Sequence, residues 1–143
     1  MNKMIIRDPF PNDFDAIANC VSAAFDNEGE VVLVQQLRAD NDVVIELVAE
    51  EAGSIVGHVV VSHLSLNPDL GLCCGGVAPL SVLPGHQSTG IGSQLMETVI
   101  EKVQTQGWTH SFYWVIPRTT IVVGLKSRTL AVTTQPSFSR PLN

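Results

Sequence analysis

The sequence lacks any hydrophobic run near the roughly 20 residues of a membrane span, and it has a single tyrosine and no acidic residue after Glu101. The first of these absences argues against a transmembrane helix. The start Met1–Asp8 also has too few hydrophobic residues for a signal peptide. We therefore expect a soluble, cytoplasmic protein that contacts no membrane.

Cysteine is also scarce. The three cysteines, Cys20, Cys73 and Cys74, make an odd number, and neither a Cys-x-x-Cys pair nor the histidine spacing of a zinc site is present. We predict no metal site and no catalytic thiol. Free cysteines of this kind usually serve as small buried hydrophobic residues.

Charge is divided unevenly along the chain. Residues 1–101 contain 3 basic and 14 acidic residues, whereas residues 102–143 contain five basic residues and no acid. A body this acidic is a poor nucleic-acid binder, because duplex affinity comes from neutralising phosphates. With 143 residues, of which 45% are hydrophobic, the chain is long enough to bury the core of one domain.

The most informative stretch is Val77–Met96, where an apolar strand leads through a polar turn into an amphipathic helix. Gly90 and Gly92 remove side chains where backbone N–H groups can approach a ligand, and the helix start adds free donors and a positive dipole end. The pattern predicts a phosphate site. It lacks the lysine of a nucleotide-hydrolysing loop, and it lacks the third glycine and the later acid of a dinucleotide site.

The run Val82-Leu83-Pro84, followed by Gln87-Ser88-Thr89-Gly90-Ile91-Gly92, resembles the acyl-coenzyme A signature of the GCN5-related N-acetyltransferases (GNAT). The resemblance implies an α/β (α+β) fold with a mixed, mainly antiparallel sheet flanked by helices. It also implies acetyl-CoA as cosubstrate and a small-molecule or peptide amine as acceptor. The diphosphate would be held by Gln87, Ser88, Thr89, Gly90, Ile91 and Gly92, and the pantetheine arm by the backbone of Leu80, Ser81 and Val82, in a gap between splayed strands.

Hydrophobic patterns place the elements in the order that this family has. We predict strands at 4–7, 43–50, 55–64 and 77–83, and helices at 14–25, 28–37 and 90–106. Asn12 or Asp13 is expected to cap the first helix, and Gly71–Gly76 is expected to be a loose connection. We assign residues 1–110 to the acetyltransferase domain.

Single residues within the strands have more ordinary interpretations. Gly57 indicates a bulge or a close backbone approach, and Pro79 removes one hydrogen bond from its strand. His58 and His63 are expected to be structural histidines on opposite faces. Glu46 is formally a candidate base, but a solvated surface glutamate is the expected role.

Residues 111–143 do not continue the family pattern, which would read Leu-Leu-Gly-Asp-Pro-Ala-Tyr-Tyr-x-Arg-Phe-Gly-Phe. A two-base shift within the codons for Phe112–Val115 spells Leu-Leu-Gly and permits Asp, so we hypothesise that this tail is translated out of frame. The alternative is a divergent native end with strands at 112–116 and 121–125. Tyr113 does not sit in the motif that carries the proton donor of many relatives, and no catalytic residue is assigned.

Two other functions stay open. The chain could be a catalytically impaired, CoA-binding remnant of such an enzyme, or an unrelated phosphate-binding α/β domain. An unfinished sheet edge near residue 112 would favour pairing into a homodimer.

Overall fold

The computed structural model describes residues 3–64 and 73–106, together with the backbone of short strands between 112 and 135. Its elements, in chain order, are β1 (Met4–Arg7), η1 (Pro11–Asp13), α1 (Phe14–Phe25), α2 (Gly29–Ala39), β2 (Val43–Glu51), β3 (Ser54–Leu64), β4 (Cys73–Val82), η2 (Pro84–His86), α3 (Ile91–Thr105), β5 (Phe112–Val115), β6 (Thr120–Ile121), β7 (Val123–Gly124) and β8 (Thr134–Gln135).

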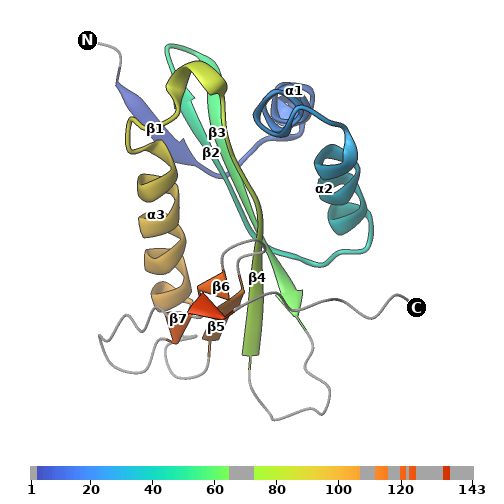
Figure 1. Cartoon of the computed structure of the whole chain (residues 1–143), viewed down its shortest axis with the longest axis vertical. Helices are drawn as coiled ribbons and strands as arrows, with labels where there is room; N and C mark the ends of the chain where they lie inside the picture. The colour runs from blue at the N-terminus through green and yellow to red at the C-terminus, as the bar shows by residue number, and fades with distance from the viewer. Residues whose placement is uncertain are drawn as a thin grey trace.

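One sheet organises the chain, with strand order β1-β2-β3-β4-β5-β7. β4 and β5 are parallel, and the other neighbours in this sheet are antiparallel. α3 covers one face of the sheet, and α1 and α2 lie on the opposite side (Figure 1). The predicted mixed, mainly antiparallel sheet flanked by helices is therefore confirmed.

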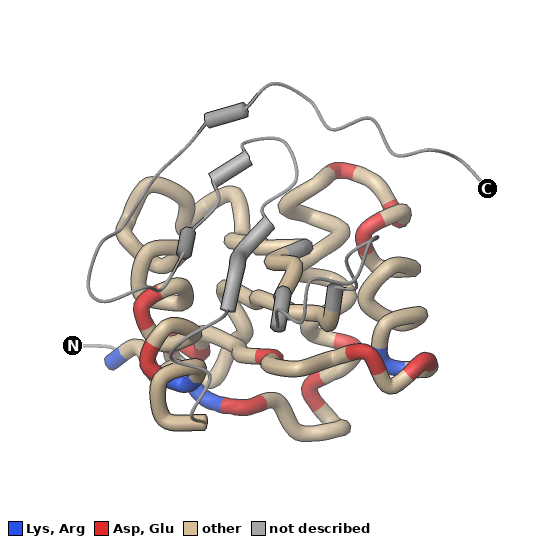
Figure 2. Tube along the Cα trace, turned by 90° about the horizontal axis from the view of Figure 1, so that it is seen from below, with Lys and Arg blue, Asp and Glu red and all other residues tan. Residues whose placement is uncertain are grey.

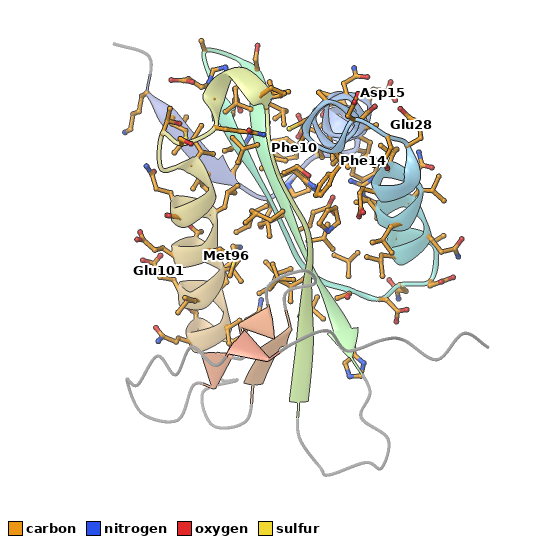
Figure 3. The ribbon with its side chains drawn as sticks, viewed as in Figure 1. Phe10, Phe14, Asp15, Glu28, Met96 and Glu101 are labelled. Atoms are coloured by element: carbon orange, nitrogen blue, oxygen red, sulfur yellow. The ribbon has the colours of Figure 1, made fainter. Side chains whose placement is uncertain are left out.

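α3 is amphipathic, as its sequence predicts. Ile91, Leu95, Val99 and Val103 repeat every four residues and are all buried against the sheet. In Figure 3, Met96 points from the helix toward the sheet, whereas Glu101 points away from it. This packing fixes the start of α3, and with it the glycine turn, against the strands.

The opposite face is built by α1 and α2. Ile17, Cys20 and Val21 of α1 form a core cluster with Val31 of α2. A predicted cap is wrong here: Asp13 makes no side-chain hydrogen bond to α1, because its carboxylate accepts from Arg7 and from the Phe10 amide. Asp13 thus ties β1 to the loop before the helix.

The connection expected at Gly71–Gly76 is also partly wrong. From Cys73 onward the chain is strand, because Cys73–Gly76 pairs with β5 on one side and Cys74–Gly76 pairs with β3 on the other. Further along β4, the register against β3 shifts between Val59 and Val61, opposite the segment that contains Pro79. A proline cannot donate to the ladder, so the bulge falls where the sequence predicts an interruption.

Candidate functional site

The turn between β4 and α3 is held by its own polar side chains. The Gln87 amide donates to the carbonyl of Val82 at 3.0 Å, and the Thr89 hydroxyl donates to the carbonyl of His86. Gly90 has φ +88° and caps α3 in the left-handed region, where glycine carries no steric penalty. These hydrogen bonds and the backbone angle at Gly90 therefore give the turn a defined conformation that leads directly into α3.

The amides of this turn are available to a ligand. Among the described residues, no backbone N–H from Ser88 to Ser93 donates to another group, and no side chain caps α3. Ser88, Thr89 and Gly90 are exposed. Free N–H donors at the positive end of a 15-residue helix form an anion-binding site.

The same turn lies against the end of β4. A Cβ built on Gly92 would come within 3.9 Å of the side chains of Leu80 and Val82. Leu80–Val82 and Gln87–Gly92, which the sequence analysis predicted to bind different parts of the coenzyme, therefore lie next to each other in the structure. Both lie at one end of α3 (Figure 1).

β4 has an open edge at this end. Its pairing with β5 runs from Cys73 to Gly76, and within the described residues no strand pairs with the β5 side of Val77–Val82. On its other side this segment is hydrogen-bonded to β3. Backbone groups along that edge are therefore free to bond an extended ligand, as in strand addition.

A buried ionic cluster lies on the α1/α2 face, and sequence reasoning missed it. Glu46 of β2 accepts hydrogen bonds from the Arg38 guanidinium of α2 (Nε to Oε1, 3.1 Å) and from His58 Nε2 of β3 at 2.9 Å. The Glu46 side chain is 9% exposed and that of His58 is 0% exposed. Glu46 is thus not the solvated surface glutamate that we expected.

The cluster shifts the protonation of both partners. Burial by itself raises the pKa of Glu46, but the hydrogen bonds from His58 and Arg38 outweigh it and hold the pKa below its ordinary value. Burial lowers the pKa of His58, opposed by the adjacent Glu46 carboxylate. At neutral pH the pair is therefore a carboxylate next to a neutral imidazole.

Ser81 of β4 lies beside this cluster. It is the register partner of His58 and is 1% exposed. Within the described residues, neither Ser81 Oγ nor His58 Nδ1 has a hydrogen-bond partner. Residues directly opposite on antiparallel strands share one face, so both groups are on the side covered by α1 and α2.

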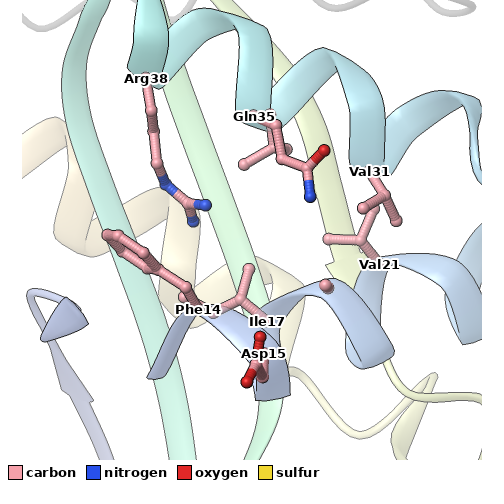
Figure 4. A pocket seen from close by; sticks show the side chains of 9 residues that line it. Phe14, Asp15, Ile17, Val21, Val31, Gln35 and Arg38 are labelled. Atoms are coloured by element: carbon pink, nitrogen blue, oxygen red, sulfur yellow. The ribbon is translucent and has the colours of Figure 1, made fainter. Parts of the chain in front are cut away.

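A pocket of about 150 Å³ opens between α1 and α2. Apolar side chains form most of its lining, and Gln35 and Arg38 reach into it from α2 (Figure 4). Arg38 also stacks on the Phe14 ring, with its guanidinium carbon 3.9 Å from the centroid. Arg38 therefore connects this pocket to the Glu46 cluster.

One predicted side-chain environment is confirmed: Cys20 is buried. In residues 3–64 and 73–106, no three His, Cys, Asp or Glu side chains gather as metal ligands, and no helix is long and apolar enough to cross a membrane. The side chain of Tyr113 lies outside the described part of the chain, and at β5 the backbone at Tyr113 and Trp114 pairs with β7.

Comparison with known proteins agrees with this architecture. The sequence profile described as Acetyltransferase (GNAT) family matches residues 12–124. The Escherichia coli K12 protein named uncharacterized N-acetyltransferase YhbS is 28% identical over 106 residues, which are 73% of this chain and 63% of YhbS. This chain thus spans less than two thirds of the length of that relative.

Two solved structures share the fold at similar identity. A GNAT family acetyltransferase from Brucella melitensis, in complex with acetyl-CoA, is 30% identical with a TM-score of 0.72, over 80% of this chain and 77% of that one. Escherichia coli YhbS, in complex with CoA, is 26% identical with a TM-score of 0.73, over 81% of this chain and 63% of that one.

Proposed function

Because this chain belongs to the acetyltransferase (GNAT) family, we propose that it transfers the acetyl group of acetyl-CoA to an amine. The observation that carries the proposal is the set of free amides from Ser88 to Ser93 beside the open edge of β4. Two relatives with this fold have been crystallised with acetyl-CoA or CoA.

Each of the two segments, Ser88–Gly92 and Leu80–Val82, binds a different part of the coenzyme. The amides of Ser88–Gly92, at the positive end of α3, bind the diphosphate, with Gln87 holding the turn in shape through its bond to Val82. The pantetheine arm lies along Leu80–Val82 as an added strand and bonds to its backbone. The two segments adjoin at Gly92, where a Cβ would make ordinary contacts at 3.9 Å with the side chains of Leu80 and Val82.

The chemistry needs a neutral amine and a polarised thioester carbonyl. Attack of the amine nitrogen on the carbonyl carbon forms the new amide bond as the nitrogen loses one proton, and the sulfur leaves as a thiolate that takes up a proton. Free backbone N–H groups on the open edge of β4 supply donors for the carbonyl oxygen as it gains negative charge.

The acceptor enters from the side of α1 and α2, where the pocket between these helices offers an apolar lining with Gln35 and Arg38. Acidic positions outnumber basic ones along the described trace (Figure 2). Such a surface attracts cationic amines and peptides before they are deprotonated.

The first experiment separates binding from turnover. Thermal unfolding is followed with acetyl-CoA, CoA and ADP, and thiol release is measured over a panel of small and peptide amines. We expect acetyl-CoA and CoA to raise Tm more than ADP, which has the diphosphate but no pantetheine arm, and at least one amine to give thiol release.

The rival functions give other results. Stabilisation by CoA without thiol release from any amine would favour the CoA-binding remnant. Equal stabilisation by ADP would favour a phosphate-binding domain that does not use the pantetheine edge. No stabilisation by any of the three ligands would overturn the coenzyme site.

A separate proposal concerns the tail, residues 111–143. We place the acetyltransferase domain in residues 1–110 and hold that residues 111–143 are read out of frame, although the family profile extends to residue 124. β5 agrees with the strand that the alternative, a native divergent end, predicts at 112–116. Sequencing the coding DNA decides: codons that cannot spell the family motif in the shifted frame would remove the proposal.

A further inference from the structure

The pocket between α1 and α2 has the size of one amino-acid side chain. Its volume is about 150 Å³. An apolar cavity of roughly that volume is enough for a six-carbon group such as benzene, whereas pockets that enclose whole drug-sized molecules measure about 300–1,000 Å³. The pocket is therefore too small to enclose a bulky acceptor, but it holds a single apolar group of a longer one.

The floor of this pocket is aliphatic. Four buried residues line it, Ile17 and Val21 of α1 and Val31 and Val34 of α2. An apolar group placed on such a floor is stabilised in proportion to the apolar area that it removes from water. The pocket thus favours a hydrocarbon side chain over a polar one.

Hydrogen-bond donors lie at one end of the pocket. Arg38 uses Nε and Nη2 to bind Glu46, and its guanidinium stacks on the Phe14 ring. Its Nη1 makes no hydrogen bond within residues 3–64 and 73–106. The exposed amide of Gln35 comes from the same face of α2, three residues earlier (Figure 4). Together the two side chains offer donors to an oxygen acceptor next to the apolar group.

The charges at this end favour a carbonyl over a carboxylate as that acceptor. The carboxylate of Glu46 already balances the charge of Arg38, and residues 1–101 contain 14 acidic and only 3 basic residues. A ligand carboxylate would place a second negative charge near Glu46, which is unfavourable in a partly buried site. A neutral amide carbonyl accepts the same hydrogen bonds without this repulsion, as a peptide backbone does.

The donors are separated from the strand to which the proposed function assigns the coenzyme. Arg38 bonds to Glu46 on β2, whereas the open edge belongs to β4, and β3 lies between these strands. Neighbouring strands are about 4.8 Å apart, so an acceptor that reaches both places spans roughly 10 Å. An extended peptide covers that distance in about three residues. A single amino acid is too short.

We propose that the acceptor is a peptide whose second or third residue places an aliphatic side chain in this pocket, while Arg38 and Gln35 donate to a backbone carbonyl. This inference rests on the proposed function and narrows its acceptor from amines in general to peptides. The N-terminal amine of the peptide then lies at the open edge of β4, where the thioester is held.

Tripeptide amides test the position of the side chain. Thiol release from acetyl-CoA is measured with tri-alanine amide and with the three peptides in which leucine replaces one alanine. We expect leucine at the second or third position to raise kcat/KM at least tenfold, because the larger side chain buries more apolar area, and leucine at the first position to change it less than threefold. No preference for leucine, or a preference confined to the first position, would overturn the inference.

Two variants act on the pocket itself. Ala18→Leu fills it from α1 and should remove the leucine preference, whereas Ala16→Leu, at an exposed position outside the lining, should keep it. Gln35→Ala removes a donor at an exposed position and needs no repacking, so kcat/KM for the preferred peptide should fall threefold or more. Gln36→Ala is its control, because that amide bonds to Asp40. Wild-type kinetics in both Ala18→Leu and Gln35→Ala would overturn the inference.

Methyl ¹H–¹³C NMR of the complex with CoA makes the test independent of turnover. The preferred peptide should shift the methyl signals of Ile17, Val21 and Val34, which line the pocket, and leave Val103 on the opposite face of the sheet unchanged. Unchanged signals from the pocket with every peptide would overturn the inference. CoA-dependent stabilisation of the same samples would show that the proposed function still stands, whereas its absence would overturn the proposed function itself.

Discussion

Gly57 of β3 lies directly beneath Ile91, the first residue of α3. A Cβ built on Gly57 would lie 3.0 Å from Ile91 Cγ2 and 3.1 Å from Leu95 Cδ1. The bare backbone of the strand therefore lets the helix approach closely, at the end where its free amides lie. Gly57 also lies next to the register shift between β2 and β3 that falls at Ala49 and Glu50.

We expect Gly57→Ala to destabilise the protein by about 2 kcal/mol, because the added methyl group has no space between the strand and α3. Urea unfolding followed by circular dichroism measures the change. Gly85→Ala is the control, since a Cβ at Gly85 meets nothing within 4 Å, and it should shift the unfolding free energy by less than about 0.5 kcal/mol. Equal stability of the two variants would show that α3 can move away from β3 at no cost.

Gly57 also illustrates what the sequence could predict. A glycine in a β-branched run has few roles, so both a bulge and a close approach were foreseeable, and both are present. The apolar residues that repeat every four positions in α3, and the interruption of β4 at Pro79, could also be predicted, because each follows from a local sequence pattern. These features fixed the fold and brought the two proposed coenzyme segments together.

The Glu46 cluster was not foreseeable in the same way. Arg38, Glu46, His58 and Ser81 come from four elements, and each taken alone has a more ordinary role. Their contact depends on strand register and on where α2 crosses the sheet, neither of which a local pattern contains. The signal that was present is the apolar run around Glu46, with Ile45 and Leu47 on one face of the strand and Val48 on the face of Glu46 itself, which indicated an element covered on both faces.

At the glycine turn, Gly92→Asp should weaken CoA binding at least tenfold while leaving stability almost unchanged. A carboxylate in the first turn of a helix interacts favourably with its dipole, but it repels a diphosphate at the same place. Isothermal titration with CoA measures the affinity. Gly92→Ala is the matched control, because a Cβ there has ordinary contacts at 3.9 Å and adds no charge, so it should bind CoA within a few-fold of wild type. Equal affinity of both variants would place the diphosphate elsewhere.

The buried His58 should make stability depend on pH. Burial holds its folded-state pKa below the ordinary value of 6.5, so as the pH falls below 6.5 the unfolded chain binds a proton that the folded protein does not. The unfolding free energy should then decrease by up to about 1.4 kcal/mol per pH unit until the folded-state pKa is reached. Urea unfolding at pH 7.5, 6.0 and 5.0 measures this slope.

His58→Gln should flatten the slope over the same interval, whereas His63→Asn, which removes an exposed imidazole, should retain it. The chosen range stays above the ordinary pKa of Glu46, 4.5, so that protonation of that carboxylate does not enter. An identical slope in wild type and His58→Gln would mean that His58 binds its proton equally well in the folded and unfolded chains.

The last prediction concerns the thiol of Cys20 and bears on the thiol-release assay. Burial raises its pKa to about 11, so at pH 8 only about 0.1% of it is thiolate, against roughly a quarter for a free cysteine. In a Cys73→Ser/Cys74→Ser background, we expect it to react with Ellman's reagent at least 100-fold more slowly than cysteine in the folded protein and at a normal rate in 6 M guanidinium. Rapid reaction of the folded variant would show that α1 leaves the sheet readily. Slow reaction means that thiol detected during turnover in this background comes from CoA, because the one remaining protein thiol is both protonated and enclosed.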